Sequence, residues 1–279
     1  MKTLFHFAYL QAISCLFPVM IFAALALSKT VSIPFLHRYD FILLLCLAAQ
    51  ILMLTLRLET WTELKVICLF HLIGICLEVY KVHMGSWSYP EEACTKIFGV
   101  PLYSGFMYAS VASYIYQAFS RLHVKVANWP HSFLSIGISL CIYLNFFTHH
   151  WLYDVRWWLI LLLIVVFRKT SVSFQAGPSS FRMPLVVSFL LIGFFIWIAE
   201  NVTTFLGAWQ YPNQQHAWSI VHLGKISSWF LLVVISIVLV IEQRKQKKRS
   251  AHLTWLNAFF NLDGLPCGDH LRQILHSFQ

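Results

Sequence analysis

The stretch LEVYKVHMGSWSYP occupies residues 77–90, and five of its residues recur later in the chain at one constant offset. They are a glutamate, a glycine, a tryptophan, a tyrosine and a proline, and each second copy lies 122 residues after the first. The pairs are Glu78 and Glu200, Gly85 and Gly207, Trp87 and Trp209, Tyr89 and Tyr211, and Pro90 and Pro212. Five matches in register are rare by chance at ordinary residue frequencies. The block therefore predicts an internal repeat, with a carboxylic acid about 10 Å of helix before each helix end.

The composition of the chain is that of a membrane protein. Of its 279 residues 59% are hydrophobic and 11% are charged, and the mean hydropathy is +0.69. A soluble chain carries about 25% charged residues, so lipid must solvate much of this surface. The formal net charge of +9 would suggest nucleic acid in a soluble chain. Here the cations gather between apolar runs, so we expect the lipid bilayer as a partner and no nucleic acid.

Apolar runs of about 17 to 25 residues are long enough to cross the bilayer core. The first such run is too long for a signal peptide, so we interpret it as a transmembrane helix. The sixth is the weakest, because Asp154 and Arg156 lie in its first turn, and seven spans is therefore the alternative. We predict an all-α, polytopic transmembrane helical bundle of about eight spans, at residues 10–28, 40–56, 65–84, 98–119, 132–149, 151–167, 184–205 and 217–241.

Lysine and arginine in the connecting segments predict the orientation, since cytoplasmic loops carry the excess. With the N-terminus in the cytoplasm, 14 of the 20 basic residues fall inside, four fall outside, and Lys81 and Lys225 lie within spans. Both termini are then cytoplasmic, and both copies of the repeated block emerge on the outer face.

Four spans separate the two copies, which predicts a parallel four-plus-four repeat. Its halves are residues 1–127 and 128–249 of a transmembrane bundle that covers 1–249. Residues 250–279 form a cytoplasmic tail, and one interpretation of this tail is a helix on the membrane surface.

Each repeated glutamate shares a helical face with small residues, which allow helices to approach closely. We therefore expect both acids to face the bundle interior, where ionisable groups are functional candidates. The acid–base candidates on the same spans are Glu78, Glu200, His71, Lys81, Lys225 and His222. The aromatic residues expected to line a substrate are Trp87, Tyr89, Trp209, Tyr211, Tyr103, Tyr108 and Tyr114.

A purely structural role is the alternative for these acids. Glu78 and Lys81 are three residues apart and could form a local ion pair, and Glu200 could pair with Lys225. Two carboxyl groups near one axis in a low dielectric would not both ionise easily, and a retained proton suits a general acid or a proton-coupled carrier. No metal site is expected, and no motif indicates a cofactor.

The sequence HLIGICLEVYKVHMGSWSYPEE, followed by FGVPLYSGFMYASVASY within residues 71–114, resembles the bacterial membrane family catalogued as domain of unknown function 817. The resemblance extends to about residue 249. It implies a multi-pass protein of the bacterial inner (plasma) membrane, and it implies no activity.

A weaker resemblance is to the lycopene-cyclase-like and carotenoid-hydratase-like membrane proteins. These carry intramembrane acids in a Glu…Gly…Tyr-x-Tyr…Val-Pro-Leu arrangement. Its counterparts here are Glu78, Gly85, Trp87 with Tyr89, and residues 100–102. Residues 90–92, Pro-Glu-Glu, lack the spacer of the cyclase Pro-x-Glu-Glu motif, so these two loop glutamates are better interpreted as solvated charges.

Three hypotheses about function remain open at this point. In the first, Glu78 or Glu200 protonates an alkene of an isoprenoid or other lipid, and Trp87 and Trp209 stabilise the cation. In the second, the acids and Lys225 couple protons to the transport of a small molecule. In the third, the protein is a non-catalytic scaffold. An enzyme predicts a closed apolar cavity at the glutamates, whereas a carrier predicts water access from both sides. The sequence leaves the oligomeric state open.

Overall fold

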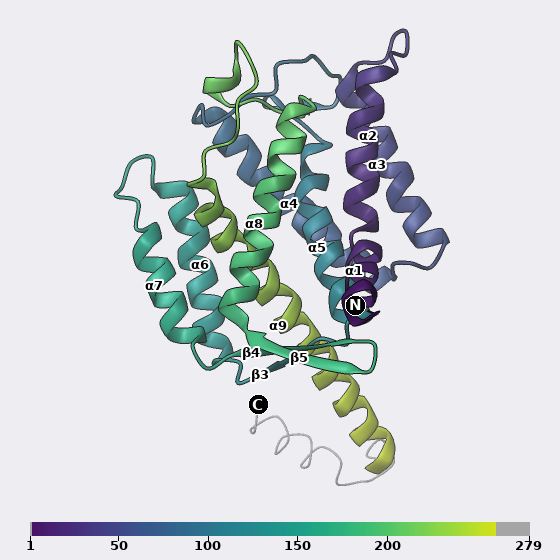
Figure 1. The fold of residues 1–279 in the computed structure, drawn as a ribbon, viewed down its shortest axis with the longest axis vertical. Helices are drawn as coiled ribbons and strands as arrows, with labels where there is room; N and C mark the ends of the chain where they lie inside the picture. The colour runs from purple at the N-terminus through teal and green to yellow at the C-terminus, as the bar shows by residue number, and fades with distance from the viewer. Residues whose placement is uncertain (1, 261–279) are drawn as a thin grey trace, which may run out of the picture. The chain divides into compact units, whose positions relative to one another are not determined.

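The computed structural model describes residues 2–260, which are mostly helical, in agreement with the predicted all-α class. Contacts divide the chain into two compact units, Met1–Val238 and Leu239–Gln279. The predicted tail is described only as far as Phe260, and the rest of it lies outside the described residues. The helices in Figure 1 are α1 (Lys2–Ser14), α2 (Leu16–Thr30), α3 (Arg38–Thr55), α4 (Trp61–His83), α5 (Ser104–Arg121), α6 (Ser132–Thr148), α7 (Arg156–Phe167), α8 (Leu185–Phe205) and α9 (Lys225–Phe260), with a short 3₁₀ turn at Pro212–Gln214.

Several helices are long and apolar enough to cross a membrane. In the described chain these are α3, α4, α8 and the segment Lys225–Gln246 of α9, and the bent pair of α1 and α2 would make a fifth span. α7 has 12 residues and extends about 18 Å, which is less than the roughly 30 Å of the hydrocarbon core. The helices thus indicate a membrane protein, and the count of eight spans remains a prediction.

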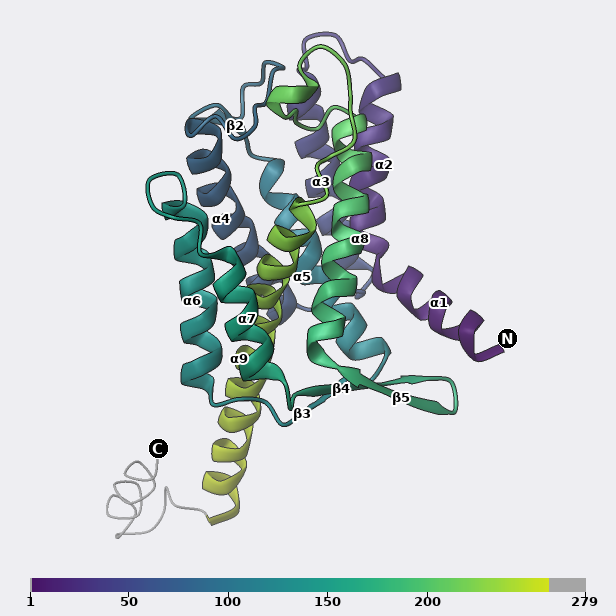
Figure 2. The ribbon, with the colours of Figure 1, turned by 60° about the vertical axis from the view of Figure 1, so that its left-hand side comes forward.

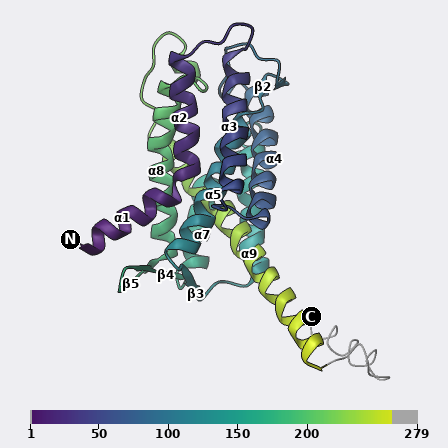
Figure 3. The same ribbon diagram turned by 90° about the vertical axis from the view of Figure 1, so that its right-hand side faces the viewer.

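The first predicted span is not one straight helix. α1 and α2 meet at a break at Cys15 and are bent by 62° (Figure 3). Pro18 has no backbone N–H, and in a continuous helix its ring would clash with the carbonyl group of Ser14. The proline therefore ends α1 and is tolerated in the first turn of α2.

Three other predicted spans begin later than expected, and one of them is α7, which begins at Arg156 instead of residue 151. Residues 98–103 are not helical, because β1 (Lys96–Ile97) and β2 (Val100–Pro101) form a hairpin with Gly99 at φ +82° in its turn. The last helix begins at Lys225 instead of residue 217. The segment before it is held by α8, whose Asn201 side chain accepts the N–H of Val221 at 2.8 Å.

A three-stranded antiparallel sheet joins the segment between α5 and α6 to the segment between α7 and α8. The sequence did not predict this sheet. β3 (Lys125–Ala127) follows α5, and it pairs with β4 (Ser171–Ala176), which pairs in turn with β5 (Ser179–Pro184). Figure 2 shows the sheet at the ends of α5 and α7, where α8 begins. The turn between β4 and β5 needs a positive φ, which Gly177 supplies at +66°.

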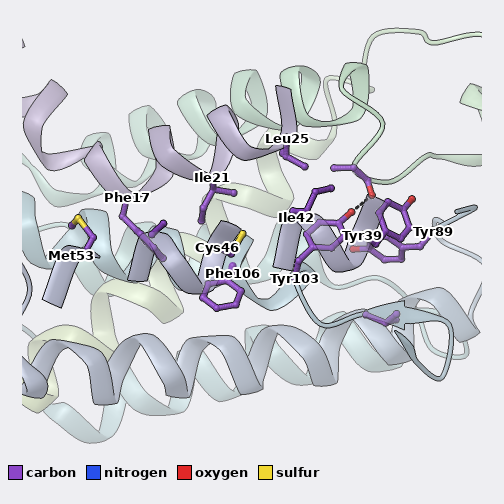
Figure 4. Packing of buried hydrophobic residues seen from close by; sticks show 13 residues of the cluster. Phe17, Ile21, Leu25, Tyr39, Ile42, Cys46, Met53, Tyr89, Tyr103 and Phe106 are labelled. Carbon is purple, nitrogen blue, oxygen red and sulfur yellow. Dashed lines mark hydrogen bonds between the residues drawn. The ribbon is translucent and has the colours of Figure 1, made fainter. Parts of the chain in front are cut away.

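A cluster of buried apolar residues joins α2, α3 and α5 (Figure 4). Phe17, Ile42 and Tyr103 are fully buried in it. Tyr103 donates a hydrogen bond, drawn as a dashed line, to the backbone carbonyl of Ala208 in the segment after α8. This cluster therefore anchors the connection that carries the second copy of the repeated block.

α4 and α8 end in the same way. In each, a glycine just after the C-cap has a φ of +69°, Gly85 after α4 and Gly207 after α8. The N–H of the next residue bonds back to the carbonyl five residues earlier, from Ser86 to Lys81 and from Ala208 to Thr203. This is the Schellman arrangement, which favours glycine at the left-handed position. Both copies of the block are thus turned back towards their helices.

Helices approach closely at glycines on the two helical faces that carry the repeated glutamates. A Cβ atom on Gly193 of α8 would lie 2.8 Å from the backbone nitrogen of Phe230 in α9. A Cβ atom on Gly74 of α4 would meet the ring of Tyr108 in α5. Only glycine fits at these two contacts without displacing the α9 backbone or the Tyr108 side chain.

We expect Gly193→Ala to destabilise the protein by about 1–3 kcal/mol, because the added methyl group would clash with the α9 backbone. Gly137→Ala on α6 is the matched control, since a Cβ atom there meets nothing within 4 Å. Thermal unfolding in detergent would measure both variants. Equal unfolding temperatures for the two would contradict the close α8–α9 contact.

Candidate functional site

Glu78 of α4 is 5% exposed and accepts three hydrogen bonds. The indole Nε1 of Trp87 and the hydroxyl of Tyr89 both donate to its Oε2, at 2.6 and 2.8 Å. The hydroxyl of Tyr108 in α5 donates to Oε1 at 2.7 Å. The turn at Gly85 makes this geometry accessible, because it returns the following segment along the end of α4. Both oxygens of the buried carboxyl group are therefore satisfied by side chains.

Glu200 of α8 is 4% exposed and is held in a related way. The hydroxyl of Tyr211 donates to Oε1 at 2.5 Å, and the indole Nε1 of Trp229 in α9 donates to Oε2 at 2.7 Å. The tyrosine bond is common to both copies. The indole bond differs, because Glu78 uses a tryptophan of the repeated block and Glu200 uses one from the next helix.

The two copies of the block touch each other directly. Ser88 and Gln210, which are also 122 residues apart, exchange two backbone hydrogen bonds of 3.0 Å. The rings of Trp87 and Tyr211 meet edge to face, with their centroids 6.0 Å apart. The groups that hold the first acid therefore lie against those that hold the second.

The two lysines predicted within spans do not form the ion pairs considered from the sequence. The ammonium group of Lys225 lies 5.0 Å from the ring centroid of Trp87 and 4.5 Å from that of Tyr211. Lys81 points to His150 Nε2, at 3.2 Å, and to the ring of His149, at 3.4 Å. Among the residues that the structure describes, neither lysine is within salt-bridge distance of a glutamate.

One large cavity connects these groups. It has a volume of about 880 Å³ and is lined mostly by aliphatic and aromatic side chains. Along α8 its wall runs from Leu185 to Thr203, a length of about 27 Å. The two glutamates lie towards one end of this wall, so the cavity combines a long apolar section with a polar end.

Most of the predicted site residues line this cavity. They come from α4, α5, α8, α9 and the two copies of the block, and they are Glu78, Lys81, Trp87, Tyr89, Tyr108, Tyr114, Glu200, Trp209, Tyr211 and Lys225.

Three predicted site residues lie outside the cavity wall. His71 packs against Phe106, with ring centroids 4.8 Å apart, and its buried Nδ1 has no hydrogen-bond partner in the described chain. His222 is exposed in the segment before α9. Tyr103 is fully buried in the α2–α3–α5 cluster, where it donates to Ala208.

Two residues of the site were not predicted from the sequence. Trp229 stands 121 residues after Tyr108, and both donate to a repeated glutamate, so a search for aromatic residues near the repeat offset would have found it. Arg156 was counted as a loop cation, but it lines the cavity and bonds to Asp154 at 2.9 Å and Ser227 at 3.3 Å. Its position depends on the fold of α6 and α7, which the sequence pattern did not specify.

A further buried acid lies away from the cavity. Glu59, between α3 and α4, is 4% exposed and accepts hydrogen bonds from Gln50, at 2.6 Å, and from Ser113. Burial raises its pKa. Because it is as buried as the repeated glutamates but does not line the cavity, it serves as a control for them.

The two repeated tyrosines stay protonated at physiological pH and so remain hydrogen-bond donors. Burial, and then the charge of the adjacent glutamate, raises the pKa of the Tyr89 and Tyr211 phenols well above the ordinary value. Each phenol therefore keeps its proton, which favours the hydrogen bond to its glutamate.

Comparisons with known proteins show the family of this chain. The family model described as "Protein of unknown function (DUF817)" matches residues 3–237. The uncharacterised protein YoaT of Bacillus subtilis (strain 168) is 57% identical over 249 residues, which cover 89% of this chain and 94% of the relative. A crystal structure of a cross-linked MvINS trimer is 13% identical, covers 64% of this chain and 93% of its own, and has a TM-score of 0.45. None of these matches supports the weaker resemblance to the carotenoid proteins.

We expect Tyr211→Phe and Glu200→Gln to be strongly non-additive. Each alone should cost about 1.5–3 kcal/mol, the range for a hydrogen bond to a charged group. The double variant should cost less than the sum of the two, because both changes weaken the bond between Tyr211 and Glu200. The measurement is a double-mutant cycle by unfolding in detergent. Tyr114→Phe, which loses a 3.1 Å bond to Gln11, is the control and should add independently to Glu200→Gln.

Proposed function

We propose that this chain, which belongs to the family described as protein of unknown function (DUF817), binds an isoprenoid or other long-chain lipid inside its helical bundle and carries out acid–base chemistry on it. Glu78 and Glu200 would exchange protons with the polar end of the lipid. The family is the one that the sequence predicts.

The observation that carries this proposal is that one and the same cavity reaches both glutamates. Its volume of about 880 Å³ is at the upper end of the range for small-molecule sites. An apolar wall about 27 Å long suits a hydrocarbon chain, and the ionisable groups at one end suit a polar head. Carboxyl groups that face a cavity inside a bundle are general acid or base candidates.

Proton transfer has more support than stabilisation of a carbocation by the aromatic rings. The faces of Trp87 and Tyr211 already contact the ammonium group of Lys225. A carbocation at these rings would have to displace that cation. We therefore place the chemistry at the glutamates and assign these two rings to holding Lys225 and to donating hydrogen bonds.

We also propose the finer topology: eight crossings as a parallel four-plus-four repeat, both termini in the cytoplasm, in the bacterial inner membrane. This topology is supported by contacts between connecting segments that are expected on the same side of the membrane. Arg38 joins two segments expected outside, through Glu91 at 2.5 Å and the carbonyl of Leu206 at 2.6 Å. The pairing of β3 with β4 joins two segments expected inside. The matching turns after α4 and α8 support the repeat.

For this topology we expect a cysteine at Asn213 to react with a membrane-impermeant maleimide in intact spheroplasts. A cysteine at Ser180 should react only after permeabilisation. Both positions are exposed, and the native cysteines would be replaced by serine to give a silent background. Labelling of Ser180→Cys in intact spheroplasts, with Asn213→Cys protected, would show that the orientation is the reverse.

The proposed function is tested by lipid profiling of a Bacillus subtilis strain that lacks the 57% identical relative. We expect this chain to restore the wild-type lipid profile, and Glu78→Gln and Glu200→Gln to fail, because an amide cannot exchange a proton in this pH range. Glu59→Gln is the matched control and should complement. If both cavity variants also complement fully, acid–base chemistry at these glutamates is excluded. If the variants fail and labelled solute uptake is lost with unchanged lipids, the protein is a carrier.

A further inference from the structure

The polar end of the cavity contains a cation that has no hydrogen-bond acceptor among the described residues. Lys225 is the first residue of α9 and lines the cavity beside the two glutamates. Within the described part of the chain its ammonium group forms no ion pair, and its contacts are with the faces of Trp87 and Tyr211. An ammonium group has three N–H donors, and in this position they face the cavity and the surrounding aromatic surface.

In the described chain neither glutamate forms an ion pair with this lysine. Glu78 already accepts from two tyrosines and a tryptophan, and Glu200 from a tyrosine and a tryptophan. These donors come from fixed aromatic side chains, which hold each carboxyl group in place. A molecule that enters the cavity can therefore supply the acceptor that Lys225 lacks.

Other cations lie near Lys225 at the same end of the cavity. Arg156 and Lys81 also line the cavity and repel Lys225, whereas Glu200 and Glu78 attract it from beyond salt-bridge distance. Asp154 pairs with Arg156, which leaves the two lysines without a carboxylate in salt-bridge contact in the described chain. Like charges in a low-dielectric interior repel strongly unless a counter-charge is present.

We infer that the cavity takes an amphiphile with one long apolar chain and an anionic head, a carboxylate or a phosphate, and that Lys225 binds the head. The inference rests on the proposed function and specifies its ligand. The chain lies along α8, where the wall is apolar for about 27 Å. The head lies at the N-terminal end of α9, where the positive end of the helix dipole adds to the charge of Lys225.

The test is a binding titration of the full-length protein in a non-ionic detergent, followed by the fluorescence of the tryptophans at the site. The probes are palmitic acid, palmitoyl lysophosphatidic acid and the neutral hexadecanol, which share one chain length. We expect at least one anionic probe to bind roughly tenfold or more tightly than the alcohol, as for a charge-assisted hydrogen bond. The preferred probe distinguishes a carboxylate ligand from a phosphate ligand.

Lys225→Met should abolish this preference, whereas Lys225→Arg should keep it. Lys96→Met is the matched control, because Lys96 also lies over a tyrosine ring, 5.6 Å from the centroid of Tyr39, but does not line the cavity. If the alcohol and both anions bind equally to the wild-type protein, the anionic head is excluded and the lipid-binding proposal stands. If no probe binds, both are excluded. The wild-type comparison decides the inference even where Lys225→Met does not fold.

Discussion

The structure of the site depends on the burial of two carboxyl groups among apolar helices. Removing a carboxylate from water costs several kcal/mol, and here five aromatic side-chain donors offset that cost. Three of these donors come from the segments that follow the Schellman turns. The turns, the contact between Ser88 and Gln210 and the anchoring of Ala208 by Tyr103 can all be understood as the means of bringing those donors to the acids.

The repeated block could be found in the sequence because it ends a helix and also holds a buried acid, and each of these roles requires particular residue types at a fixed spacing. A left-handed helix end favours glycine, and a buried acid needs a donor at a fixed distance along the chain. Gly85 with Tyr89 and Gly207 with Tyr211 satisfy both requirements at one offset, and both glutamates are buried at the same cavity. The prediction of family membership is also confirmed.

Other features had no such signal. The break at Cys15 depends on a clash between Pro18 and the preceding turn, which average hydropathy does not register. The β3–β4–β5 sheet consists of short polar strands between apolar runs, and these look like ordinary loops in the sequence. The ion pairs considered as an alternative for Lys81 and Lys225 do not form in the described chain. Spacing on one helix cannot show that a histidine pair or an aromatic face from another element lies closer to each lysine.

The central claim is that the cavity at the two glutamates holds a lipid, and native mass spectrometry of the protein purified from membranes tests it most directly. Ala199 lines the cavity one residue before Glu200, so Ala199→Trp fills it, whereas Leu190→Trp adds the same ring to the outer face of α8, where Leu190 is 51% exposed. We expect the wild-type protein and Leu190→Trp to retain one bound lipid, and Ala199→Trp to lose it. Equal retention by a folded Ala199→Trp variant would contradict the account.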